Sequence, residues 1–183
     1  DLAMSCLAGD AKPRPKATTL RLVPWVETEG EALAAWVAAD TWPFHGTANP
    51  TAEQVEGWIA KGVFTGDDNQ TLWIQEGDER VGLLAFHEID DATPIFDLRL
   101  RSAVRGRGFG KQALALVAEH AFAQLDKTRV EGHTRVDNLP MINVFQACGW
   151  TRESHTRECW PDAQGTLLDA LTFGLLRREW SPA

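Results

Sequence analysis

The sequence predicts a mixed α/β protein of the α+β type that folds as one domain, and three observations support this fold class. The chain has 183 residues, which is most simply a single domain. Hydrophobic residues make up 44% and charged residues 24%, so a sizeable core is expected. Apolar residues recur at every second position in some segments and at helical spacing in others. The segments follow one another in the order β-α-α-β-β-β-α-β-α-β-β.

The first part of the chain predicts a strand followed by two helices. Residues 19–25 alternate between apolar and polar side chains, as a half-buried strand does. Residues 28–40 carry apolar side chains at helical spacing. The segment 50–62 begins with a capping box, in which Thr51 is the N-cap and Gln54 follows three positions later.

The middle of the chain predicts a hairpin, a strand and a helix. Residues 71–89 form two strand patterns joined around the turn sequence EGDE. Residues 95–100 alternate, with Asp97 and Arg99 on the face opposite the apolar side chains. The helix at 109–124 has an apolar stripe.

The last part predicts three strands and one short helix. Residues 129–136 alternate again, and the short helix at 139–149 has a proline in its first turn and a glycine after its end. The segments 150–159 and 167–176 are the two closing strands.

Residues 1–17 differ from the rest in being polar, proline-containing and unpatterned. We expect a flexible N-terminal tail, in part an expression remnant, and one domain over residues 18–183. The tail lacks the basic start and apolar core of a signal peptide. No apolar run approaches the roughly 18 residues that would span a bilayer, so no membrane association is expected.

Charge and cysteine content narrow the functional classes. A formal net charge of −8 and a pI near 5.1 argue against nucleic acid as the main partner. The three cysteines, Cys6, Cys148 and Cys159, are odd in number and form no C-x-x-C pair. We therefore expect reduced thiols, a cytoplasmic protein and no metal site.

The stretch RSAVRGRGFGKQALAL, residues 101–116, combines glycines with positive charge at the start of a predicted helix. From Arg99 to Lys111 there are five cations and no acid, a local reversal of the net charge. A helix N-terminus has unpaired N–H groups and partial positive charge, and glycines let a phosphate approach the backbone. This pattern predicts a bound anion, a pyrophosphate above all. A solvated charged turn is the alternative.

Two common nucleotide-binding patterns do not fit this stretch. A phosphate-binding Walker loop requires a glycine where Arg105 stands and a Ser or Thr where Gln112 stands. The dinucleotide pattern G-x-G-x-x-G fails as well, because the three glycines are two positions apart.

The stretch from Arg105 to Gly110 resembles the R/Q-x-x-G-x-G/A signature of the GNAT superfamily of N-acetyltransferases. A second signature follows, in which Asn138 ends a strand and Gly149-Trp150 closes the next helix. The closing segment DALTFGLLRREW is similar to the RimJ/RimL-like branch. This resemblance covers residues 18 to 180. It implies the GNAT fold, whose central, twisted and mostly antiparallel sheet is splayed between its fourth and fifth strands.

The resemblance also implies acetyl-CoA as the cofactor and transfer of its acetyl group to a primary amine by direct attack in a ternary complex. The glycine stretch would hold the pyrophosphate, the fourth strand would offer backbone groups to the pantetheine arm, and the second signature would hold the arm from the other side. The cofactor-binding residues so implied are Leu98, Arg99, Leu100, Arg105, Gly106, Arg107, Gly108, Phe109, Gly110, Lys111, Asn138, Asn143 and Phe145.

A protonated amine must lose a proton before it attacks, so we looked for a general base. His133 stands five residues before Asn138, where ribosomal-protein alanine acetyltransferases have a glutamate. Histidine suits the role because its pKa lies near neutral pH. A hydrogen-bonded strand histidine with no catalytic role is the alternative, and His87 and Glu88 are the other candidates.

The general acid of the family is missing from this sequence. Many members have a tyrosine where Phe145 stands, the RimJ/RimL-like branch often has a serine where Met141 stands, and the chain contains no tyrosine. We expect the thiolate to leave unassisted or through water. Slow catalysis and a non-catalytic acyl-CoA sensor or interaction module are the alternatives. A toxin that acetylates aminoacyl-tRNA is a third possibility. It would require a basic surface, which the net charge of −8 does not favour.

Acceptor selection in the family falls to the linker between the first two helices. There Asp40 could attract a cation, while Trp42, Phe44 and His45 could form an aromatic wall. The alternative is a loop that packs its aromatic residues onto the core. The expected acceptor is a small-molecule or protein N-terminal amine, and a homodimer is left open. Three tryptophans are expected in the core: Trp58, Trp73 and Trp160.

Overall fold

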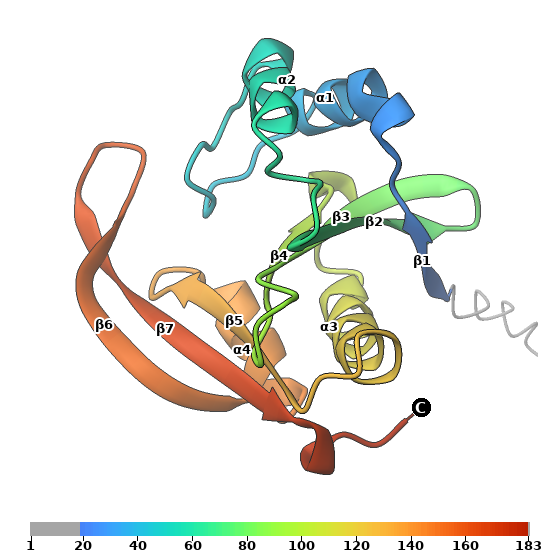
Figure 1. Cartoon of the computed structure of the whole chain (residues 1–183). Coiled ribbons are helices and arrows are strands. Elements are labelled where there is room, and N and C mark those ends of the chain that lie inside the picture. The colour runs from blue at the N-terminus through green and yellow to red at the C-terminus, as the bar shows by residue number, and fades with distance from the viewer. Residues whose placement is uncertain (1–18, 183) are drawn as a thin grey trace, which may run out of the picture.

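The structure is a computed structural model that describes residues 19–182, in which a seven-stranded sheet carries helices on both faces (Figure 1). The strands are β1 Leu20–Pro24, β2 Asn69–Glu76, β3 Glu79–His87, β4 Ile95–Leu100, β5 Arg129–Arg135, β6 Thr151–Pro161 and β7 Leu167–Leu176. The helices are α1 Gly30–Ala38, α2 Ala52–Ala60, α3 Phe109–Glu119 and α4 Leu139–Ala147. The predicted element order is therefore confirmed.

The sheet consists of two antiparallel halves that meet at one parallel contact. Strands β1 to β4 form the first half, strands β5, β7 and β6 form the second, and β4 pairs with β5 in parallel at Ile95 and Glu131 alone. The amide of Glu131 donates to the carbonyl of Pro94 at 3.2 Å. Beyond this point the two halves separate, and the β6–β7 hairpin curves away (Figure 1). The predicted splay between the fourth and fifth strands is confirmed.

Alternation along β2 and β3 produces one hydrophobic core on each face of the first half. Trp73 and Leu83 belong to the cluster that includes buried residues of α1 and α2. Their neighbours Leu72 and Leu84 belong to the larger cluster beneath α3 and α4. Because both faces are covered, β2 and β3 are buried almost throughout and form a rigid frame for β4.

Some details differ from the sequence expectation. The regular part of α3 ends at Glu119, and residues 120–124 continue as one π-helical turn in which His120 stacks on Phe86 and bonds to Gln70. Trp73 lies in the core, as predicted. Trp160 does not, because the β6–β7 hairpin projects beyond the core, leaving this side chain half-buried at the edge of a cavity.

The expected tail, residues 1–17, and Cys6 lie outside the described residues. Cys148 and Cys159 are free thiols. Within residues 19–182, no helix has the length and apolarity that crossing a bilayer requires.

Candidate functional site

The loop before α3 leaves backbone donors open on its outer side. Gly106 and Gly108 adopt positive φ angles of 76° and 82°, and Gly108 is the N-cap of α3. A side chain placed at either glycine would meet nothing within 4 Å. Phe109 is buried and fixes the start of the helix in the core. The first-turn N–H groups therefore stand next to open space, as a bound phosphate requires.

Gly110 has a different role in this loop. A Cβ atom at Gly110 would lie 3.1 Å from Cγ2 of Val144, so this glycine allows α3 and α4 to pack closely. Close packing of these helices places the start of α3 next to the second signature, where Asn143 is exposed on α4.

The cations around this loop also contact the protein itself. Arg105 donates to the carbonyl of Thr41 at 2.8 Å and to the carbonyl of Leu100 at 3.0 Å, so it ties the α1–α2 linker to the end of β4. Arg107 pairs with Glu76 at 3.1 Å. Lys111 is exposed. Positive charge therefore surrounds the glycine loop, and Arg105 also supports the linker.

The backbone of β4 offers hydrogen-bonding groups to the gap left by β5. Backbone groups of alternate strand residues point to the same side. Since the Pro94 carbonyl bonds to β5, the groups of Leu98 and Leu100 also point to that side. The backbone groups of the odd-numbered residues of this segment face β3 instead. The hydrogen bond from the Arg101 amide to the Val81 carbonyl, 2.9 Å long, shows this. The backbone of Arg99 is thus directed at β3, and only its side chain faces the cavity.

A cavity of about 480 Å³ lies at the opening between the two halves of the sheet. Its walls come from the α1–α2 linker, the ends of β3 and α4, strands β4 and β5, and the hairpin tip. The lining residues are Phe44, His45, Gly46, His87, Ile95, Phe96, Asp97, Leu98, Arg99, His133, Thr134, Asn138, Met141, Phe145 and Trp160.

Of the seven catalytic and acceptor candidates of the sequence analysis, His133, His87, Phe44 and His45 line the cavity, and three do not. Trp42 is fully buried, stacked on Trp36 with ring centroids 5.3 Å apart. Asp40 accepts a hydrogen bond from the Ser102 amide at 2.7 Å. Glu88 is exposed in the turn after β3, with a φ of 56°.

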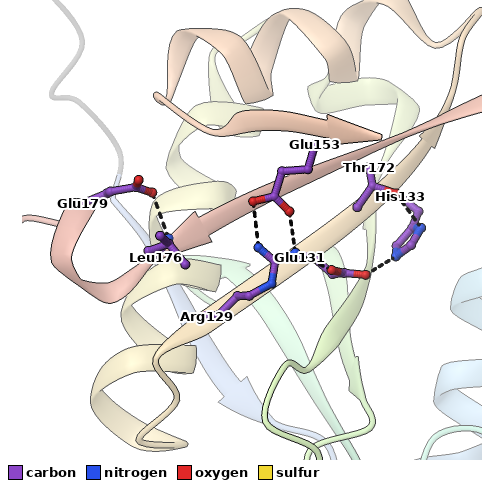
Figure 2. Close-up of polar contacts among 7 residues, drawn as sticks. All are labelled: Arg129, Glu131, His133, Glu153, Thr172, Leu176 and Glu179. Atoms are coloured by element: carbon purple, nitrogen blue, oxygen red, sulfur yellow. Dashed lines mark hydrogen bonds and ion pairs between the residues drawn. The ribbon is translucent and has the colours of Figure 1, made fainter. Parts of the chain in front are cut away.

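His133 is held by a polar cluster of side chains from β5, β6 and β7 (Figure 2). Its Nε2 lies 2.9 Å from Oε1 of Glu131, and its Nδ1 lies 3.4 Å from Oγ1 of Thr172 on β7. Arg129 bonds to Glu131 at 2.6 Å and to both carboxylate oxygens of Glu153 on β6. The period of two along β5 places positions 129, 131 and 133 on this one face.

This polar cluster carries one surplus negative charge next to the imidazole, because two carboxylates share a single guanidinium. Gly174 makes the arrangement possible: a Cβ there would lie 2.5 Å from Nη1 of Arg129 and 2.6 Å from Oε1 of Glu153. Sequence analysis missed Glu131, although its position two residues before His133 on a strand was a usable signal.

Asp97 is the second residue that sequence analysis left out of the site. Its carboxylate lies 2.8 Å from Nε2 of His45 and 3.2 Å from Nε of Arg99. Burial favours a raised pKa for Asp97, but the charges of Arg99, His45 and His87 outweigh burial and hold the pKa well below its ordinary value. The alternation of residues 95–100 had placed Asp97 and Arg99 on one face.

Two residues of the second signature are engaged in the fold. The side chain of Asn138 caps α4 by accepting a hydrogen bond from the Met141 amide at 3.3 Å. Phe145 is 1% exposed and stacks on Phe173 with ring centroids 4.6 Å apart. The ring at the family's acid position therefore supports the core beneath the cavity.

Comparison with known proteins identifies the family. The sequence model described as "Acetyltransferase (GNAT) domain" matches residues 19–151, and the chain therefore belongs to this family, whose cofactor is acetyl-CoA. The N-acetyltransferase p20 of Bacillus licheniformis is 27% identical over 113 residues, which are 61% of this chain and 63% of p20. The chain thus spans less than two thirds of that relative.

Solved structures resemble the chain in fold. A spermidine N-acetyltransferase from Vibrio cholerae in complex with CoA and spermine has a TM-score of 0.73 at 15% identity, covering 88% of this chain and 97% of that one. RimJ of Mycobacterium smegmatis in complex with CoA-disulfide has a TM-score of 0.72 at 19% identity, covering 87% and 83% of the two chains.

Proposed function

We propose that this protein is an N-acetyltransferase that transfers the acetyl group of acetyl-CoA to a primary amine by direct attack in a ternary complex. The observation that carries the proposal is the cavity at the splay of β4 and β5, with His133 in its wall and the carboxylate of Glu131 bonded to that histidine. When bound, acetyl-CoA would supply the acetyl group as an activated thioester.

The described residues fit this cofactor. The open N–H groups at the start of α3 and the charges of Arg105, Arg107 and Lys111 suit a diphosphate. The backbone groups of Leu98 and the amide of Leu100 are directed at the gap between the strands, where they suit the amides of a pantetheine arm, while the Leu100 carbonyl is bonded to Arg105. Asn138 and Asn143 remain candidates for contacts from the other side.

His133 is the general base in this proposal. A carboxylate only accepts hydrogen bonds, so Nε2 of the neutral imidazole carries the proton that bonds to Glu131. Nδ1 then keeps its lone pair, which the Thr172 hydroxyl contacts at 3.4 Å, and the amine takes the place of this long contact when it gives its proton to Nδ1. The surplus negative charge of the polar cluster stabilises the imidazolium that results.

No tyrosine hydroxyl is available to protonate the departing thiolate. The ring of Phe145 is buried and has no polar atom, and a thiol with a pKa of about 8.5 can leave as thiolate. We therefore propose that the thiolate leaves unassisted or takes its proton from water.

A thiol-release assay over a panel of amines, with acetyl-CoA binding followed by calorimetry, tests the proposal. CoA release that depends on the amine supports an enzyme. Acetyl-CoA binding with no release above background for any amine would instead support a non-catalytic acyl-CoA sensor on the same fold.

A further inference from the structure

We propose that the acceptor is a small amine that also carries a carboxylate, as an amino acid does, with Arg99 binding the carboxylate and Asp97 the ammonium group. The inference rests on the proposed function and specifies its substrate class. Its starting point is a charged group in the cavity wall with an unused hydrogen-bond donor.

Arg99 is that group. Its side chain is 10% exposed, its Nε bonds to Asp97 at 3.2 Å, and its guanidinium lies over the ring of Trp42 at 5.4 Å from the centroid. Its Nη1 atom is buried without any hydrogen-bond partner. Leaving a buried charged donor unpaired is costly. The unpaired donor of Arg99 therefore suggests that a bound ligand supplies its hydrogen-bond acceptor.

Asp97 complements this donor. Its side chain is 32% exposed, although it already accepts from Arg99 and His45. The carboxylate has further lone pairs and remains ionised at neutral pH. Arg99 and Asp97 thus present a positive and a negative group side by side on β4, and these charges are complementary to those of an amine that also carries a carboxylate.

The charge inventory of the cavity argues against a polycation. Asp97 is the only carboxylate among the lining residues, and the other titratable lining groups are Arg99 and three histidines: His45, His87 and His133. A second ammonium group would lose its water and find no further carboxylate in the lining, because Glu131 lies outside it and is already bonded to Arg129 and His133, so binding of that group is unfavourable. A carboxylate on the acceptor would instead meet the positive groups.

The remaining wall suits a small apolar body. Phe44, Phe96, Phe145 and Trp160 contribute aromatic surface, and about 480 Å³ has to hold the end of the cofactor arm as well as the acceptor. The acceptor is therefore of the size of one amino acid with an apolar or aromatic side chain.

Matched pairs of an amino acid and its decarboxylated amine test the inference, because each pair differs by the carboxylate alone. We choose phenylalanine with 2-phenylethylamine and leucine with 3-methylbutylamine, measured by CoA release and by titration into the CoA-saturated full chain. We expect at least a tenfold preference for the amino acid in kcat/KM and in affinity. Arg99→Gln should reduce the preference to within twofold while the Kd for acetyl-CoA stays the same.

Two further variants make the test decisive. Arg101→Gln is the matched control, since Arg101 lies over the ring of Trp36 and does not line the cavity, so the preference should remain. Arg99→Lys keeps the charge and should retain part of the preference if Arg99→Gln unfolds. Equal or better use of the decarboxylated amines would overturn the inference and leave the proposed function standing. Absence of CoA release would reject the proposed function, while the titrations would still decide whether the cavity prefers the carboxylate.

Discussion

Nε2 of His133 lies 2.9 Å from Oε1 of Glu131, and both side chains project from the same face of β5 (Figure 2). The pair orients the imidazole and fixes which nitrogen carries the proton. Of the histidines in the cavity wall, His133 and His45 have a carboxylate partner, and each partner is also bonded to an arginine: Glu131 to Arg129 and Asp97 to Arg99. Arg129 is in addition shared with the second carboxylate Glu153, so the cluster beside His133 has a surplus negative charge, which favours His133 as the base.

His133→Ala should lower turnover about 10²-fold at neutral pH, a typical value for removal of a general base. The loss should shrink as pH rises, because the fraction of unprotonated amine grows. Initial rates of CoA release between pH 6.5 and 9.5 measure this. His155→Ala is the control, since His155 pairs with Asp169 on the outer hairpin and does not line the cavity. A rate and pH profile equal to those of the parent protein would remove His133 from the mechanism.

Glu131→Gln tests whether Glu131 positions His133. We expect kcat to fall about tenfold while the KM for acetyl-CoA stays the same, because the amide keeps the shape but can bind either tautomer of the imidazole. Glu131→Asp should recover part of the loss. A fall in melting temperature with unchanged kcat would show instead that Glu131 serves only the fold.

Arg105→Glu should raise the Kd for acetyl-CoA at least tenfold, because it places an anion beside the proposed diphosphate site. Arg105 also bonds to the Thr41 carbonyl, and Arg105→Gln separates the two roles, since glutamine can keep a hydrogen bond without the charge. Calorimetric titration measures both variants, with Arg157→Glu on the exposed β6 strand as the control. An unchanged Kd for Arg105→Glu would argue that the diphosphate lies elsewhere.

Asp97 should make the fold sensitive to acid. Its pKa in the folded chain lies below the ordinary value of 3.8, so the folded state stabilises the ionised form. This contribution is complete above the unfolded pKa and is lost as pH falls below it toward the folded pKa. The free energy of unfolding, measured with urea at pH 7, 5, 4 and 3, should therefore fall more steeply with decreasing pH for the parent chain than for Asp97→Asn. Equal losses of unfolding free energy in the two proteins would contradict this account.

Gly132→Ala should destabilise the fold by about 1–3 kcal/mol, as overpacking of a core does. Its Cβ would lie 2.7 Å from the ring of Phe145 and 2.8 Å from that of Phe96, beneath the cavity. Gly57→Ala in α2 meets nothing within 4 Å and should stabilise by about 0.5–1 kcal/mol. Chemical denaturation of both variants measures the two effects. A Gly132→Ala variant as stable as the parent chain would show that the aromatic rings can move aside.

The sequence by itself determined the order of the elements and the start of α3 at the glycine loop, whereas the place of the splay was implied only by the resemblance to the GNAT superfamily. The first two depend on local chemistry: the alternation of side chains, the capping residues and the glycines with open space around them. The same local pattern placed Asp97 and Arg99 on one face of β4. Their importance could not be inferred there, because their partner His45 is 52 residues away along the chain.

Only the tertiary structure decided which polar residues share the cavity. It placed His133 of β5, His45 of the linker and His87 at the end of β3 in the wall of one cavity, and it left Glu88, Asp40 and Trp42 outside. Trp160, which was expected in the core, lies in the cavity wall instead. These outcomes depend on how two half-sheets diverge after one parallel contact, which is a property of packing over the whole chain and not of any local pattern.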